Sequence, residues 1–201
     1  MKGSVYTVLY AAVLGTVCAL LLTGTSAVTK PYIEANKDAE RMRNILEVLE
    51  VPGIEEAGSQ ELTQIYEESV SEKKYGSLTV YETSDGAVAV PFAGTGLWGP
   101  IKGFLALESD KKTIRGVTFY EQEETPGLGG EIGAQSFRDQ FKGKSLRGED
   151  RTLGILIARG GSSARNGVDA ITAATMTCEK VQAMLNKTID AIAEEFGDDV
   201  Q

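Results

Sequence analysis

The feature that most constrains this chain is an uncharged, apolar run near its start, from Ser4 to Val28. A helix needs ~20 predominantly apolar residues to cross a bilayer, and this run is long enough. We therefore expect residues 1–29 to form one N-terminal transmembrane helix. The alternative is a signal peptide, cleaved after the small residues Thr25-Ser26-Ala27. Because only Lys2 precedes the run, a retained anchor is favoured over a signal peptide.

The charges that flank the run decide its orientation only weakly. Lys2 precedes it, while Lys30 and Lys37 follow it. The short N-terminal tail is expected to stay inside, with the long C-terminal part translocated. The predicted location is the cell (inner) membrane, with a single pass and the domain on the extracytoplasmic side.

Residues 30–53 are predicted to form a juxtamembrane amphipathic helix. Pro31 suits a first helical turn, and Pro52-Gly53 ends the pattern. Between them, apolar residues recur at spacings of three and four, which is typical of a helix with one buried face. They are Ile33, Ala39, Met42, Ile45, Leu46 and Leu49.

Residues 54–201 are expected to form one domain. Its first part, Glu55–Lys74, is polar and gives no clear secondary structure. Four strand patterns follow in two pairs, each pair separated by a turn sequence, as in β-hairpins. The strands are Ser77–Glu82 with Ala87–Phe92, and Gly103–Leu107 with Ile114–Glu121.

The rest of this domain shows one more strand pattern and two helical ones. A short helix is predicted from Ala134 to Phe141 and a buried strand from Leu153 to Ala158. An apolar stripe predicts a C-terminal helix that begins near Thr175. The fold class is therefore α+β, a mostly antiparallel sheet packed with helices.

The composition excludes several classes of chemistry. The chain has no histidine, so imidazole metal sites and histidine-based triads are absent. Its net charge of −9 repels nucleic acid. Its two cysteines, Cys18 and Cys178, cannot supply the four ligands of an iron–sulfur cluster. Carboxylates, hydroxyls or a bound cofactor must carry any chemistry, and a cluster would belong to a partner chain.

Hydroxyl residues gather at the start of the last predicted helix, in the segment Asp169-Ala170-Ile171-Thr172-Ala173-Ala174-Thr175-Met176-Thr177. The first turn of a helix presents unpaired N–H groups and the positive end of its dipole. A phosphate ester at Thr175 would lie against these donors. Taken alone, however, Thr172, Thr175 and Thr177 are better explained as capping residues of the helix.

Two more segments upstream are rich in glycine. Glu124-Thr125-Pro126-Gly127-Leu128-Gly129-Gly130-Glu131 follows a strand, and alone it would be a turn in which glycines supply positive φ. Gly96-Leu97-Trp98-Gly99-Pro100-Ile101-Lys102-Gly103 precedes a strand. A single tryptophan such as Trp98 is more often a core residue, and a single lysine such as Lys102 is more often solvated.

These three segments, in this order, resemble the motifs of the FMN-binding domain family. In that family the motif near the last helix reads Asp, two variable residues, Ser or Thr, a small residue, then Ala-Thr. The final threonine, here Thr175, carries flavin mononucleotide (FMN) through its phosphate. Thr172 and Ala173 stand where serine and glycine are commoner.

The resemblance implies that residues of all three motifs bind FMN. The attachment motif supplies Asp169, Thr172, Ala173, Ala174, Thr175, Met176 and Thr177. The glycine-rich loop supplies Glu124, Thr125, Gly127, Leu128 and Gly129, and the upstream segment supplies Trp98 and Lys102. The glycines of the loop are expected to permit close approach of the flavin ring. The resemblance implies neither a catalytic residue nor a metal ligand.

Two kinds of membrane-anchored subunit are similar to this chain in the order of the motifs. They are the C subunit of the Na⁺-translocating NADH:quinone oxidoreductase and the G subunit of the Rnf complex. The resemblance implies an electron relay through covalent FMN, with polytopic and iron–sulfur or flavin subunits as partners and a flavin transferase during maturation. The alternative is an extracytoplasmic FMN-binding module with no role in an ion pump. A stand-alone flavin reductase ranks last, because no dinucleotide-binding fingerprint is present.

Overall fold

The computed structural model describes residues 2–197 and divides the chain into two compact units, one ending at Ala39 and the other beginning at Glu40. Helix α1 (Lys2–Val48) contributes to both. The division falls inside the segment predicted as a juxtamembrane helix. Pro31 lies within α1 rather than in a first turn, so the two predicted helices form one.

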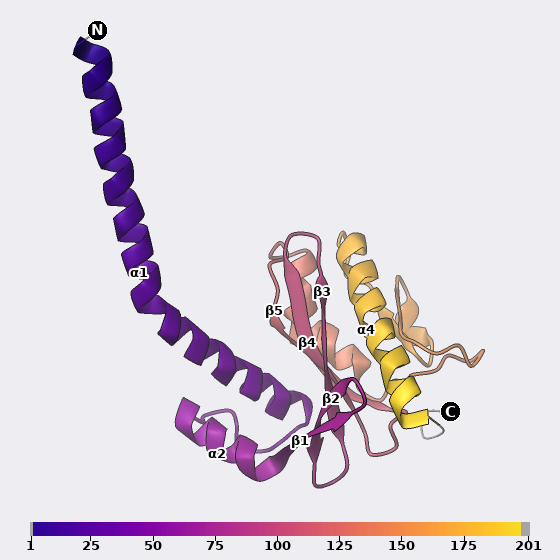
Figure 1. Ribbon diagram of the computed structural model, residues 1–201. Coiled ribbons are helices and arrows are strands. Elements are labelled where there is room, and N and C mark those ends of the chain that lie inside the picture. The colour runs from indigo at the N-terminus through magenta and orange to yellow at the C-terminus, as the bar shows by residue number, and fades with distance from the viewer. Residues whose placement is uncertain (1, 198–201) are drawn as a thin grey trace. The chain divides into compact units, whose positions relative to one another are not determined.

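The first unit is the N-terminal part of α1 (Figure 1). Among the described residues, α1 is the one helix long and apolar enough to cross a membrane, with a mean hydropathy of 2.2 in its most apolar window. Its apolar side chains between Val5 and Val28 are exposed. That exposure is expected of a helix whose surroundings are lipid.

The second unit is built on a five-stranded antiparallel sheet in which each strand pairs with the next along the chain (Figure 1). The strands are β1 (Val70–Tyr75), β2 (Leu78–Thr83), β3 (Val88–Thr95), β4 (Pro100–Leu107) and β5 (Ile114–Glu121). The predicted α+β fold and both predicted hairpins are confirmed. Strand β1 was not predicted, because its sequence Val-Ser-Glu-Lys-Lys-Tyr is charged and mostly exposed. Charged side chains are common on edge strands, where they discourage pairing with other chains.

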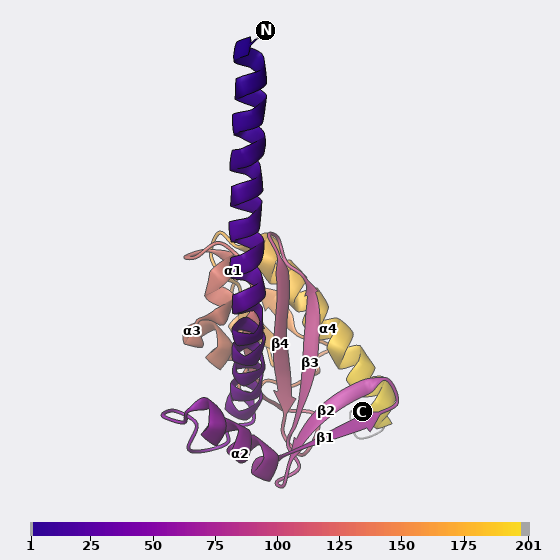
Figure 2. The ribbon, with the colours of Figure 1, turned by 60° about the vertical axis from the view of Figure 1, so that its left-hand side comes forward.

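Both faces of the sheet are covered (Figures 1 and 2). Alternate side chains of a strand point to opposite faces, and here each set is apolar. Val88, Val90 and Leu105 pack toward helix α4 (Thr175–Phe196), whereas Ala89 and Phe104 pack toward the last turns of α1 and helix α2 (Ser59–Ser69). The predicted C-terminal helix and its start at Thr175 are thus confirmed.

Short elements connect β5 to α4. They are η1 (Gly129–Gly133), α3 (Gln135–Arg138), η2 (Asp139–Phe141), β6 (Leu156–Ala158), η3 (Gly161–Ser163) and β7 (Gly167–Asp169). The helix predicted from Ala134 to Phe141 is divided between α3 and η2. The strand predicted from Leu153 is only β6, and its Leu156 is exposed rather than buried. It pairs in parallel with β7, which was not predicted.

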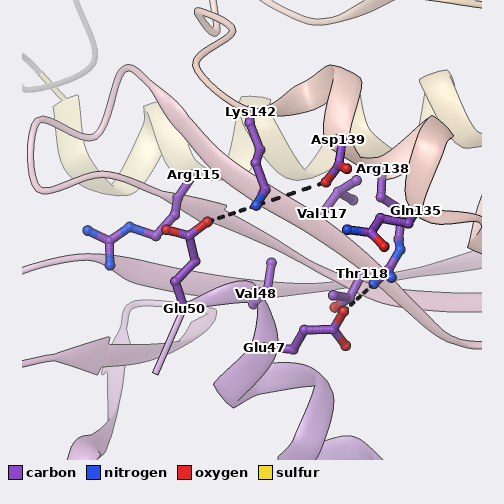
Figure 3. A pocket seen from close by; sticks show the side chains of 11 residues that line it. Glu47, Val48, Glu50, Arg115, Val117, Thr118, Gln135, Arg138, Asp139 and Lys142 are labelled. Carbon is purple, nitrogen blue, oxygen red and sulfur yellow. Dashed lines mark hydrogen bonds and ion pairs between the residues drawn. The ribbon is translucent and has the colours of Figure 1, made fainter. Parts of the chain in front are cut away.

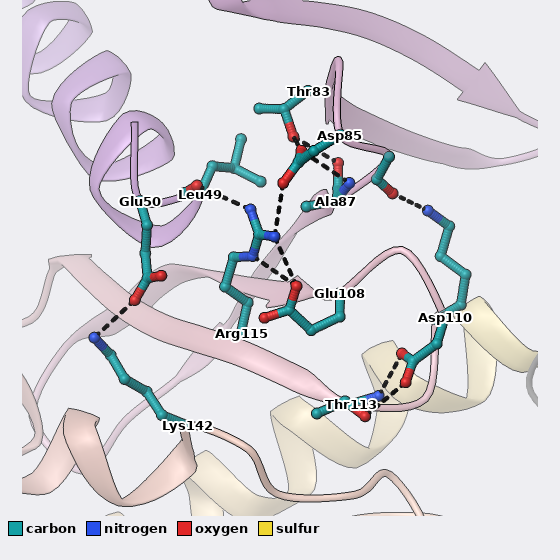
Figure 4. Close-up of polar contacts among 12 residues, drawn as sticks. Leu49, Glu50, Thr83, Asp85, Ala87, Glu108, Asp110, Thr113, Arg115 and Lys142 are labelled. Carbon is teal, nitrogen blue, oxygen red and sulfur yellow. Dashed lines mark hydrogen bonds and ion pairs between the residues drawn. The ribbon is translucent and has the colours of Figure 1, made fainter. Parts of the chain in front are cut away.

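Ion pairs fasten the end of α1 to α3 and to the segment after η2, and a hydrogen bond from Arg115 fastens it to the sheet. Around a cavity of ≈ 220 Å³, here called the Arg138 cavity, Glu47 contacts Arg138 at 2.7 Å and Glu50 contacts Lys142 at 2.9 Å (Figure 3). On β5, Arg115 donates to Glu108, to Asp85 and to the carbonyl of Leu49 (Figure 4). Because the cations that line this cavity are all paired, it is a structural clamp and not a binding site for anions.

Candidate functional site

The predicted attachment motif forms the entrance to α4. Ala173 takes a left-handed conformation, with φ of +61°, and Ala174 is the N-cap without a side-chain capping bond. The hydroxyls therefore do not cap the helix, which removes the simpler explanation for these threonines. Within residues 2–197, the backbone N–H groups of Thr175, Met176 and Thr177 have no acceptor. Such a helix start attracts anions.

The first cavity at this helix start has a volume of ≈ 340 Å³ and is called the Trp98 cavity here. All three sequence motifs contribute to its walls. Ten of the predicted site residues line it: Trp98, Glu124, Thr125, Leu128, Gly129, Ala173, Ala174, Thr175, Met176 and Thr177. Segments far apart in the sequence thus converge on one place.

Four large apolar side chains are exposed around the Trp98 cavity. They are Leu97, Trp98, Leu128 and Met176, and Trp98 is 70% exposed. Among the described residues from Glu40 onward, Leu156 is the one other large hydrophobic residue that is exposed to this degree. Trp98 is therefore not a core residue. An apolar, partly open cavity of this size suits one face of a planar aromatic ligand.

Glu124 holds the three motifs together. One carboxylate oxygen accepts the backbone N–H groups of Leu97 at 2.7 Å and Trp98 at 3.1 Å, while the other accepts the hydroxyl of Thr177 at 2.5 Å. Burial by itself would raise the pKa of Glu124, but these three donors outweigh it and hold the pKa below its ordinary value. The side chain is 4% exposed, so it positions the walls and does not itself present charge to a ligand.

The two loop glycines serve different needs. Gly127 has φ of +75°, which favours glycine, and the space beside it is open. A side chain on Gly129 would instead meet the Thr177 hydroxyl and the Glu124 carboxylate. The absence of a side chain at Gly129 is thus required by the Glu124–Thr177 bond, which differs from the expected role in approach of a flavin ring.

Thr175 also lines a second cavity, of ≈ 530 Å³, which is called the Arg159 cavity here. Thr172 and Ala173 belong to its walls as well. Among the described residues, the exposed Arg159 is the one cation in the walls of either cavity, and Glu179 adds a carboxylate to the Arg159 cavity. Cys178 also contributes to the wall, and burial raises the pKa of its thiol. Thr175 therefore stands between a largely apolar cavity and one that contains both a guanidinium, Arg159, and a carboxylate, Glu179.

Three threonines of the motif differ in accessibility. Thr172 and Thr175 are exposed, whereas Thr177 is buried and its hydroxyl is bonded to Glu124. In the described part of the chain, the Thr175 hydroxyl has no hydrogen-bond partner. Of the two hydroxyls in the first turn of α4, only that of Thr175 is open to modification.

Three predicted residues lie outside both cavities. Gly127 of the loop is one, and Asp169 and Lys102 are the other two. Asp169 accepts the backbone N–H and the hydroxyl of Ser162, at 3.1 Å and 2.7 Å, and these bonds lower its pKa. Lys102 contacts Glu121 at 2.8 Å, and that hydrogen bond raises the lysine pKa. The structure thus gives both residues local partners and does not bring them to the cavity walls.

Leu97 and Arg159 also line the cavities, but neither was predicted as a site residue. Leu97 lies in a motif that was recognised, but an apolar residue beside Trp98 carries no signal of its own. Arg159 stands in Ala-Arg-Gly-Gly after β6, and its sequence context does not distinguish it from a surface arginine. Both reach the site through tertiary contacts.

The fold and these cavities define a cofactor-binding α+β domain. Residues 96–190 match the model of the FMN-binding domain family. The matched range begins at the Gly96 motif and ends within α4.

Several curated relatives are C subunits of the Na⁺-translocating NADH-quinone reductase. The protein from Vibrio alginolyticus is 35% identical over 162 residues, which cover 80% of this chain and 58% of the relative. The protein from Neisseria meningitidis is 40% identical over 116 residues, which cover 56% of this chain and 45% of the relative. The chain thus spans about half the length of these relatives. They favour the first of the two subunit types considered above.

Solved structures of the same kind of protein share the fold. The structure of the C subunit from Parabacteroides distasonis has a TM-score of 0.69 and 27% sequence identity, covering 83% of this chain and 96% of that one. The structure of the C subunit from Shewanella oneidensis has a TM-score of 0.64 and 27% identity, covering 76% of this chain and 91% of that one. The similarity therefore includes most of the folded unit.

Proposed function

We propose that this chain is a membrane-anchored electron-transfer subunit of a Na⁺-translocating NADH-quinone reductase, carrying FMN in a phosphoester bond to Thr175. The observation that carries this proposal is the position of Thr175. It is an exposed, unbonded hydroxyl on the first turn of α4, shared by the walls of two cavities. It coincides with the last threonine of the family's attachment motif.

The two cavities suit the two ends of FMN. The Trp98 cavity offers Leu97, Trp98 and Leu128 to an apolar ring. A phosphate diester at Thr175 would meet the unpaired N–H groups of the helix start, with Arg159 on the other side. The residues present therefore fit the cofactor. When bound, the flavin supplies reversible electron transfer, while the protein supplies attachment, orientation and electrostatics.

The proposed function also includes a membrane anchor, partner subunits and a flavin transferase. Residues 1–29 would be the anchor, residues 30–53 the juxtamembrane segment and residues 54–201 the FMN-binding domain, facing the extracytoplasmic side. The apolar N-terminal helix supports an anchor in the membrane. Polytopic and iron–sulfur or flavin subunits would exchange electrons with the flavin. A flavin transferase would attach FMN and recognise the exposed Thr172–Thr175 turn together with Asp169.

Replacement of single threonines tests the attachment. After expression with the flavin transferase, Thr175→Ala is expected to lose all flavin fluorescence in a denaturing gel, because the ester oxygen is missing. Thr152→Ala is the matched control, since this exposed threonine lies outside the attachment motif and both cavities, and the variant should keep its covalent flavin. Thr177→Ala should also keep it, although the ring environment changes with the loss of the bond to Glu124.

Intact mass of each purified variant provides the second measurement. A wild-type chain heavier by one FMN residue, and a Thr175→Ala chain without that increment, would agree with the proposal. Covalent flavin that persists in a correctly folded Thr175→Ala protein would contradict it. Co-purification of the tagged chain with redox subunits from its native membrane tests the electron-relay assignment separately from the attachment.

A further inference from the structure

A fourth cavity lies away from the proposed flavin site and is strongly basic. It has a volume of ≈ 720 Å³ and is called the Arg165 cavity here. Its walls contain four cationic side chains, Lys112, Arg147, Arg151 and Arg165, but a single carboxylate, Glu149. In a chain with a net charge of −9, this is a local reversal of sign.

The sequence around this cavity also contains more basic than acidic residues. Residues 142–165 contain six lysine and arginine residues but only two acidic ones, Glu149 and Asp150. The Asp150 carboxylate is used within its own turn, where it accepts the backbone N–H and the hydroxyl of Thr152. Asp150 forms no ion pair with Arg151 or Arg165 in the described part of the chain.

Backbone hydrogen bonds fix the segments that carry the cations. The N–H of Leu146 donates to the carbonyl of Lys112 at 2.9 Å, and the N–H of Ser145 donates to the carbonyl of Arg165 at 3.2 Å. The N–H of Arg151 donates to the carbonyl of Gly148 at 3.0 Å. Three distant segments are thus held together with their positive charges on one concave surface, although like charges repel one another.

The Arg138 cavity provides an internal comparison. Its cations, Arg115, Arg138 and Lys142, all have carboxylate partners (Figures 3 and 4). In contrast, Lys112, Arg151 and Arg165 have no carboxylate within 4.0 Å in the part of the chain that the structure describes. The cations of the Arg138 cavity are neutralised from within the chain, whereas Lys112, Arg151 and Arg165 of the Arg165 cavity are not neutralised by any residue that the structure describes.

We propose that the Arg165 cavity binds a phosphate-bearing anion. Arginine presents a planar fork of donors that matches two phosphate oxygens, and three of the four cations are arginines. A cavity of this volume admits a group larger than one phosphate, such as a polyphosphate or the headgroup of an anionic phospholipid. A chain held at a membrane would keep the folded unit near such headgroups, where each basic residue attracts an anionic surface.

Two assays on the full-length chain distinguish the two sources of phosphate. In nonionic detergent, inorganic pyrophosphate is added and binding is followed by ³¹P NMR and by the rise in the unfolding temperature. In nanodiscs, hydrogen exchange of residues 145–153 is compared between phosphatidylcholine alone and a mixture with phosphatidylglycerol. The tested variant is Arg151→Gln with Arg165→Gln, both exposed residues.

The control variant, Lys74→Gln with Lys187→Gln, removes the same charge from exposed positions outside the cavity. We expect wild type and control to bind, and the cavity variant to bind about fivefold more weakly for each charge removed. Binding of pyrophosphate indicates a soluble ligand, and protection only in anionic nanodiscs indicates a headgroup. The proposal is overturned if the wild-type protein responds neither to pyrophosphate nor to anionic nanodiscs. It is also overturned if the cavity variant and the control lose binding to the same extent, provided that both unfold at the wild-type temperature in the absence of ligand.

Discussion

At the scale of single residues, Glu124 joins the three motifs of the proposed flavin site through its hydrogen bonds with Leu97, Trp98 and Thr177. Replacing it with alanine leaves the N–H groups of Leu97 and Trp98 without an acceptor and the Thr177 hydroxyl without its partner. We expect Glu124→Ala to lower the free energy of unfolding by about 1–3 kcal/mol, the usual cost of buried groups left unpaired. Urea denaturation measures this loss.

The same variant should also shift the visible absorption of bound flavin, because Trp98 and Leu97 are no longer held in the cavity wall. Glu131→Gln is the control, since this carboxylate contacts only the nearby Gly127 N–H at 3.1 Å in an exposed loop. A Glu124→Ala protein with wild-type stability and an unchanged flavin spectrum would show that the carboxylate does not hold the motifs together.

Ala173 provides the second prediction at this scale. Its φ of +61° is left-handed, a conformation that costs an alanine roughly 1–2 kcal/mol and a glycine almost nothing. Glycine is more flexible in the unfolded chain, which offsets part of the gain. We expect Ala173→Gly to raise the free energy of unfolding by up to about 1 kcal/mol and to keep flavin attachment. Ala170→Gly, at a residue without positive φ, should be destabilising instead.

At the scale of elements, Arg115 connects the end of α1 to two turns of the sheet. Its guanidinium is 15% exposed and donates to Glu108, Asp85 and the Leu49 carbonyl. At pH 7, Arg115→Gln is expected to lower the free energy of unfolding by about 2 kcal/mol, because it removes charged hydrogen bonds from a mostly buried site. Lys73→Gln, which breaks the exposed contact with Glu82, should cause no measurable change.

The stability difference between wild type and Arg115→Gln should depend on pH because of Asp85. Hydrogen bonds from Thr83 and Arg115 lower the pKa of Asp85 from 3.8 to about 2. A carboxyl group with a depressed folded pKa contributes stability above its unfolded pKa and loses it as pH falls through the folded value. The difference in the free energy of unfolding between wild type and Arg115→Gln should therefore be constant above about pH 5. It should decrease as the pH falls from 3.8 to about 2. A stability difference that increases as the pH falls would contradict this role of Asp85.

At the scale of the whole molecule, the end of α1 belongs to the folded unit. Ile45, Leu46, Val48 and Leu49 are buried against the sheet, and Arg43 donates to the carbonyls of Ile54 and Ala57. We expect a fragment of residues 40–201 to be soluble without detergent and to unfold cooperatively. A fragment of residues 54–201, which starts at the boundary expected from the sequence, loses these four buried side chains, each worth about 1.5–3 kcal/mol.

The shorter fragment should therefore be poorly folded. Circular dichroism and thermal unfolding of the two fragments, compared with the full chain in detergent, provide the measurement. If both fragments unfold with the same transition, the end of α1 is only a linker. Extraction of the full chain with carbonate tests the anchor separately, because a retained span keeps the chain in the membrane pellet.

Much of the fold was accessible from local patterns. The two hairpins have alternating apolar strands with turn residues between them, and α4 has an apolar stripe, so each element carries its own signal. Strand β1 and the parallel pair of β6 and β7 lack such signals. Each is short or charged, and each is held by neighbours rather than by its own sequence.

By itself, the sequence determined the apolar N-terminal helix, the α+β class, the start of α4 at Thr175 and the motifs of a flavin site, because periodicity and short motifs are local properties. Only the tertiary structure decided that α1 is continuous past Pro31 and ends within the core. Only the tertiary structure decided that Glu124 joins the three motifs and that Lys112 and Arg165 line one basic cavity. The reason is physical: these contacts join residues distant in sequence, and their geometry exists only after the sheet and helices have packed.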